Sequence, residues 1–170
     1  FIAQGPLAAE ELPVERFLPE YERLWQSYEE LGGDFIWAGA AFWGVPWVEA
    51  LAGCGVYADQ QTGSTRSVPP EDFRGVEDLP AFDPEGPWAR KAREFLSHLR
   101  ERSAGRFPLG TTLMRGISDL LSALYGGPEF LFRLMDHPAE QRRLVRALTD
   151  LWLAFARHQL AEIPDFHGGV

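Results

Sequence analysis

The feature that most constrains the fold is a long stretch of helical periodicity from residue 138 to about residue 162. Leu144, Leu148, Leu151 and Phe155 recur there at three- and four-residue spacing, and charged residues lie between them. This spacing predicts an amphipathic helix with one continuous apolar face. Because such a face is stable only when it is covered, either the rest of the chain packs on it or another protein does.

The remaining elements are predicted to be short. Periodic apolar residues and Gly or Pro boundaries predict helices over residues 14–31, 46–52, 88–102, 113–125 and 128–136. Aromatic and β-branched runs predict brief strands over residues 34–38, 53–57 and 107–110, with a further strand beginning at residue 163. Residues 59–87 are rich in turn formers and are expected to be irregular.

Short strands separated by helices are typical of a parallel sheet with crossover helices, so the fold class expected is α/β. A closed (β/α)8 barrel of the TIM type needs about 250 residues, and the chain has 170. We therefore expect a single incomplete domain over residues 1–170, a helix-rich partial TIM barrel forming roughly its N-terminal half. The unpaired strand edges of a half barrel are expected to favour self-association.

Composition argues against several functions. A net charge of −9 repels phosphate backbones, so nucleic acid is not an expected partner. Cys54 is the only cysteine, which rules out an internal disulfide and fits a cytoplasmic protein. No apolar run approaches the roughly 18 residues of a membrane span, so no membrane partner is expected.

Three stretches together resemble the uroporphyrinogen decarboxylase superfamily, which includes corrinoid- and coenzyme-linked methyltransferases. The first is GDFIWAGAAFWGVPWVEALAGCGV at residues 33–56, and the second is FPLGTTLMRGISDLL at residues 107–121. The third is LFRLMDHPAE at residues 131–140, followed by the long helix. The resemblance lies in the order and spacing of these stretches.

The resemblance implies an enzyme, either a decarboxylase (a lyase) or a methyltransferase, whose ligand is a small molecule, a tetrapyrrole or a corrinoid. The decarboxylases carry an aspartate just after the first strand, where this chain has Gly39, Ala40 and Ala41. Alanine cannot accept hydrogen bonds from pyrrole N–H groups with its side chain. A methyltransferase-like branch, with a thiol or corrinoid carrier, is therefore preferred, and uroporphyrinogen decarboxylation in tetrapyrrole biosynthesis is the alternative.

The family's methyltransferases bind zinc through one His and two Cys in the later half of the barrel. None of those ligands can be assigned here, so no metal site or cofactor is predicted in this chain, and zinc or a corrinoid is expected only in a complete protein. The 170 residues alone are expected to be inactive.

Residues that directly follow the predicted strands are candidates for the site, because barrel sites lie at the C-terminal ends of strands. His167 could act as an acid or base or bind metal, or have no role. Thr111 and Thr112 could hold an anionic group or simply cap a helix starting near residue 113. Arg115 could bind a carboxylate or face solvent.

The aromatic residues Trp43 and Trp47, with Phe42, could wall a flat or corrin-like ligand, or belong to the core. Glu49 matches a glutamate of the methyltransferase-like version of this passage, where it would position a loop. Cys54 is expected to be a small buried residue.

A second hypothesis is a non-catalytic helical binding or assembly module, whose helix at residues 138–162 docks a partner. The two hypotheses differ in what covers the apolar face of that helix.

Overall fold

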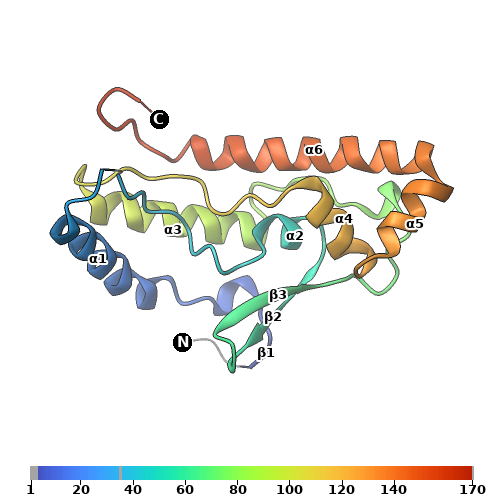
Figure 1. Cartoon of the computed structure of the whole chain (residues 1–170), viewed down its shortest axis with the longest axis horizontal. Coiled ribbons are helices and arrows are strands. Elements are labelled where there is room, and N and C mark those ends of the chain that lie inside the picture. The colour runs from blue at the N-terminus through green and yellow to red at the C-terminus, as the bar shows by residue number, and fades with distance from the viewer. Residues whose placement is uncertain (1–3, 35, 170) are drawn as a thin grey trace.

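Six α-helices and a small three-stranded sheet make up the part of the chain that the computed structural model describes, residues 4–34 and 36–169 (Figure 1). The helices are α1 (Val14–Leu31), α2 (Trp47–Leu51), α3 (Pro87–Ser103), α4 (Ile117–Tyr125), α5 (Glu129–Asp136) and α6 (Pro138–Leu160). The strands are β1 (Gly5–Pro6), β2 (Gly55–Asp59) and β3 (Ser64–Val68), and the 3-10 helices are η1 (Ala9–Glu11) and η2 (Val76–Asp78). Across these residues no helix is long and apolar enough to span a membrane.

The expected partial TIM barrel is wrong. The sheet is open, its order is β1-β2-β3, and both strand pairs are antiparallel. Strand β3 was not predicted, because its sequence Ser-Thr-Arg-Ser-Val is largely polar and lies within a segment rich in turn formers. A tight turn at residues 60–63, with Gly63 at φ +65, returns the chain directly beside β2. Such a short connection permits only antiparallel pairing, whereas parallel neighbours need a long crossover.

In the described part of the chain, the strands predicted at residues 34–38 and 107–110 do not form; one isolated parallel bridge, between Gly39 and Leu109, joins this part of the chain. The N–H of Gly39 donates to the carbonyl of Pro108 at 2.9 Å, and the N–H of Gly110 donates to the carbonyl of Gly39 at 2.8 Å. Pro108 has no N–H to extend the ladder, and among the described residues no further strand lies beside the bridge. Phe35, within the first predicted strand, lies outside the described residues. The predicted strand at residue 163 is instead a turn closed by a bridge between Phe166 and Gly169, and Val170 also lies outside the described residues.

The predicted helix bounds agree with the structure to within two residues, except at the start of α4. Helix α1 has the predicted bounds and ends at Gly32, which adopts the left-handed conformation (φ +59) that glycine favours. Helix α4 begins at Ile117, four residues after the predicted start. The reason is a capping interaction, in which the carboxylate of Asp119 accepts a hydrogen bond from the N–H of Gly116 at 3.1 Å.

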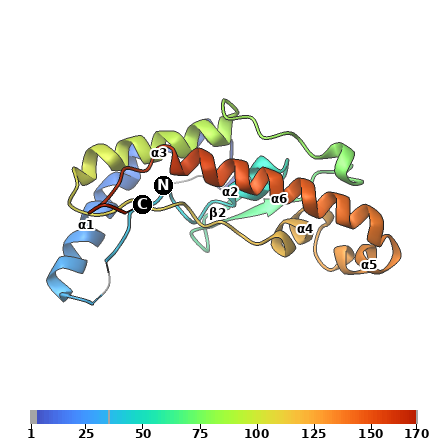
Figure 2. The ribbon, with the colours of Figure 1, turned by 90° about the horizontal axis from the view of Figure 1, so that it is seen from above.

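Helix α6 lies along one side of the molecule, over α3, α2, α4 and α5, while the sheet lies on the opposite side (Figures 1 and 2). Its apolar face is buried, with Leu144, Leu148 and Phe155 fully inaccessible to solvent. The chain therefore covers its longest apolar face with its own helices, not with a sheet.

Candidate functional site

A polar cavity of about 410 Å³ lies where α2, β3 and α4 meet. Its ionisable lining residues are Glu49, Arg115 and Asp119, and Ser67 of β3 contributes a hydroxyl. We call it the glutamate–arginine pocket. Two passages that are far apart in the sequence, residues 33–56 and 107–121, both contribute to it.

Glu49 is the buried acid of this pocket, and its position follows from α2. Trp47 and Val48 precede it and are fully buried, so the short helix is anchored in the core and places Glu49 at 1% exposure. Its Oε1 lies 3.3 Å from Nε of Arg115. Its Oε2 is also buried and has no hydrogen-bond partner among the described residues.

This environment favours the neutral form of Glu49. Burial raises the pKa of its carboxyl above the ordinary value, and the negative charge of Asp119 adds to that effect. A hydrogen bond from the backbone of Glu49 and the positive charge of Arg115 lower the pKa, but only in part. The Glu49 carboxyl therefore stays protonated to a higher pH than that of an ordinary surface glutamate, and while it is protonated it can donate as well as accept hydrogen bonds.

Arg115 lies at the open side of the pocket, with about half of its side chain exposed. The indole Nε1 of Trp152 on α6 donates to the carbonyl of Arg115 at 3.1 Å, which ties this loop to the long helix. Asp119 uses one carboxylate oxygen to cap α4. The guanidinium pairs with Glu49 through Nε and is otherwise half exposed at the mouth of the pocket, where an anionic ligand could reach it.

Thr112 connects segments and does not face a ligand. It is buried, its Oγ1 donates to the carbonyl of Ala41 at 2.9 Å, and its N–H donates to Oε1 of Gln159 at 2.8 Å. Thr111 is half-buried beside it. Both precede α4 by several residues, so the prediction that they cap this helix is wrong.

The two tryptophans do not form one wall. Trp47 belongs to the core, where its Nε1 donates to the carbonyl of Phe42 at 2.8 Å and its ring meets Trp88 edge-on. Trp43 is 71% exposed and lines a different cavity together with Phe42.

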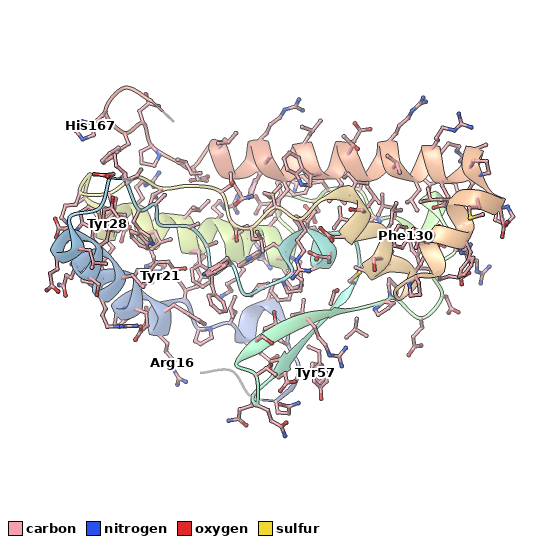
Figure 3. The ribbon with its side chains drawn as sticks, viewed as in Figure 1. Arg16, Tyr21, Tyr28, Tyr57, Phe130 and His167 are labelled. Carbon is pink, nitrogen blue, oxygen red and sulfur yellow. The ribbon has the colours of Figure 1, made fainter. Side chains whose placement is uncertain are left out.

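His167 is not part of the pocket. It lies on the loop beyond α6, at one end of the molecule, where it is exposed and stacks edge-on against Phe166 (Figure 3). Its φ of +51 reflects the tight turn there.

Cys54 is not suited to be a thiolate ligand of zinc. Burial, with a smaller effect from Glu49, raises the pKa of the Cys54 thiol to about 12, so the thiolate that zinc requires is disfavoured. Among residues 4–34 and 36–169, no group of three or more His, Cys, Asp or Glu side chains could hold a metal ion.

Of the lining residues, sequence reasoning identified Glu49 and Arg115; among the polar ones it missed are Ser67 and Asp119. Ser67 lies on β3, a largely polar strand that the sequence pattern does not predict. The spacing of Gly116 and Asp119 is that of a helix start, and recognising it would have placed Asp119 one turn from Arg115. No protein-family model, curated protein or solved structure matches the chain.

Proposed function

We propose that this chain belongs to an enzyme of the uroporphyrinogen decarboxylase superfamily, in its methyltransferase-like branch, and that the glutamate–arginine pocket binds a small anionic substrate. The observation that carries this proposal is the buried carboxyl of Glu49 opposite the half-exposed guanidinium of Arg115. An arginine at the mouth binds a carboxylate or sulfonate through charge-assisted hydrogen bonds. The buried carboxyl behind it, whose Oε2 has no hydrogen-bond partner among the described residues, would bind a second polar group of the same molecule.

Two further observations support the proposal. The three ionisable residues of the pocket, Glu49, Arg115 and Asp119, come from the two passages whose sequences resemble the family. Ala40 and Ala41 replace the aspartate that a pyrrole-binding site would need. A cytoplasmic location is proposed with it, on the ground that the sole cysteine is free and buried.

The test is calorimetric titration of the 170-residue chain with 2-mercaptoethanesulfonate, an anion that carries a thiol, and with ethanesulfonate, which lacks the thiol. We expect the thiol compound to bind more tightly. Arg115→Met should weaken its binding about tenfold or more, the value of one or two charge-assisted hydrogen bonds. Arg146→Met, which removes an exposed arginine of α6, is the matched control and should have no effect.

Equal binding by the two sulfonates would remove the support for a thiol substrate, and binding that Arg115→Met leaves unchanged would remove this pocket from the proposal. Uroporphyrin is titrated in parallel. Tighter, Arg115-dependent binding of uroporphyrin would favour the alternative, a decarboxylase of tetrapyrrole biosynthesis.

A second candidate function, assembly with another copy of the chain, rests on α5 and not on α6. The apolar face of α6 is already covered, but Leu131, Phe132 and Met135 on α5 are 51%, 60% and 79% exposed. Neighbouring exposed apolar residues mark interaction surfaces. If α5 forms a dimer, light scattering after size exclusion should give a mass above 19.1 kDa, and Met135→Lys should return it to that of the monomer. A monomer at all concentrations would contradict this candidate.

A further inference from the structure

A second cavity, of about 400 Å³, lies between α1 and the β2–β3 hairpin, apart from the glutamate–arginine pocket. Its volume is within the range typical of small-molecule sites, roughly 300–1,000 Å³. Its lining combines aromatic rings with carboxylates, and none of the described residues that line it is Lys, Arg or His.

The aromatic wall comes from α1 and from the loop before α2. Phe17 and Phe42 are in contact, with ring centroids 4.6 Å apart. Tyr21 is fixed by a hydrogen bond of 2.7 Å from its hydroxyl to the carbonyl of Ala40 (Figure 3 shows Tyr21 on α1). Trp43 also lines the cavity, which we call the aromatic pocket, and is 71% exposed. Its ring is therefore open to a ligand. Rings of this kind attract cations through their negative faces, and Trp does so most strongly.

Two carboxylates lie at the opposite sides of the cavity. Glu20 projects from α1 and pairs with Arg23 one helical turn further on, but Arg23 is not part of the lining. Asp59 ends β2, and its Oδ1 accepts hydrogen bonds from the N–H groups of Gln61 and Thr62, which holds the carboxylate at the hairpin turn. Both carboxylates would lie beside a ligand in the cavity.

An anion would meet the negative charge of Asp59 beside the carboxylate of Glu20, and a neutral ligand would leave Asp59, which has no ion-pair partner among the described residues, without a counter-charge. A compact inorganic cation would not use the aromatic surface. The combination of rings and negative charge suits a small organic cation with an apolar surface, of the quaternary ammonium class. The net charge of −9 adds a general attraction for cations.

We propose that the aromatic pocket is a binding site for a small quaternary ammonium ligand, held by the face of Trp43 and the carboxylates of Glu20 and Asp59. This site is independent of the proposed anion site, since none of its residues is shared with the glutamate–arginine pocket.

The test follows the indole N–H signals of the 15N-labelled chain by NMR during titration with choline. The signal that Trp43→Phe removes is assigned to Trp43. The comparison ligand is 3,3-dimethylbutan-1-ol, which has the same shape as choline but carries a neutral carbon in place of nitrogen. We expect choline to shift the Trp43 signal saturably and the neutral alcohol to bind several-fold more weakly.

Single substitutions distinguish the contribution of the aromatic rings to choline binding from that of the carboxylates. Trp43→Leu should weaken choline binding about three- to thirtyfold, the range of cation–π interactions from exposed to desolvated sites, while Trp43→Phe should retain part of it. Asp59→Asn keeps a side-chain oxygen that can accept the hydrogen bonds of the turn. Glu20→Gln changes a partly exposed side chain on α1. Each should preserve the fold and weaken binding about two- to fivefold.

Glu30→Gln is the matched control for charge, because Glu30 is exposed on the same helix near its other end, and it should leave choline binding unchanged. Equal affinity for choline and its neutral isostere would overturn the proposal. The proposal would also be overturned if Trp43→Leu left choline binding unchanged. The same holds if Glu30→Gln weakened choline binding as much as Asp59→Asn does. Arg115→Met, which tests the anion site, should not alter choline binding.

Discussion

Replacing Glu49 with glutamine tests whether burial, not Arg115, dominates the ionisation of this carboxyl. A carboxyl whose pKa is higher in the folded chain than in the unfolded chain binds more protons when folded. The contribution of Glu49 to stability therefore falls as the pH rises from the unfolded value, about 4.3, through the raised folded value. The loss is complete above the folded pKa.

The magnitude follows from linkage. Each unit by which the folded pKa of Glu49 exceeds the unfolded one removes about 1.4 kcal/mol of stability at high pH. A glutamine at position 49 does not titrate, so its contribution to stability does not depend on pH. Its amide nitrogen would occupy the place of Oε2, which has no partner among the described residues, and this costs about 1 kcal/mol at every pH. The wild-type protein should thus be the more stable at pH 4, and its advantage should shrink or reverse by pH 8.

The assay is urea denaturation followed by tryptophan fluorescence at pH 4, 5, 6, 7 and 8, for the wild type and Glu49→Gln. Glu30→Gln, which removes an exposed carboxyl, should track the wild type throughout. A difference between wild type and Glu49→Gln that stays constant over this range would refute the reasoning. A wild-type advantage that grows with pH would show instead that the attraction of Arg115 outweighs burial.

Three further predictions concern the core. Phe155→Ala should destabilise the protein by about 3–5 kcal/mol in urea denaturation, because Phe155 is fully buried, while Leu153→Ala on the exposed face of α6 should cost less than about 1 kcal/mol; equal losses would contradict the packing of α6. Cys54 should resist iodoacetamide at pH 8 in the folded chain and react in urea, as followed by mass spectrometry, because burial raises the pKa of its thiol to about 12; rapid labelling of the native protein would contradict its burial. Thr112→Val leaves the carbonyl of Ala41 without its hydrogen bond and should lower the free energy of unfolding by about 1–3 kcal/mol; an unchanged urea midpoint would show that this bond contributes nothing.

Sequence reasoning identified two ionisable residues of the candidate site, but not that they lie next to each other. Glu49 and Arg115 were both singled out, yet 66 positions separate them in the chain, and no local pattern indicates that their side chains meet. Thr112 and Trp47 were singled out too, and packing placed them in structural roles. The difference lies in their partners: the polar groups of Thr112 and Trp47 are bonded to the backbone or to Gln159 of the same chain, whereas Oε2 of Glu49 has no partner among the described residues. Those partners depend on tertiary packing and not on neighbours in the sequence.

The fold shows the same division. The periodicity of apolar residues by itself determined the helices, and it predicted the bounds of α1 correctly, because helical hydrogen bonds are local and the pattern has to match their 3.6-residue period. Only the tertiary structure decided the sheet. Strand pairing joins residues that no sequence period links, so the polar strand β3 went unseen and the antiparallel hairpin with β2 replaced the expected barrel. The long helix α6 was evident from its sequence, but which elements cover it was a matter of three-dimensional packing.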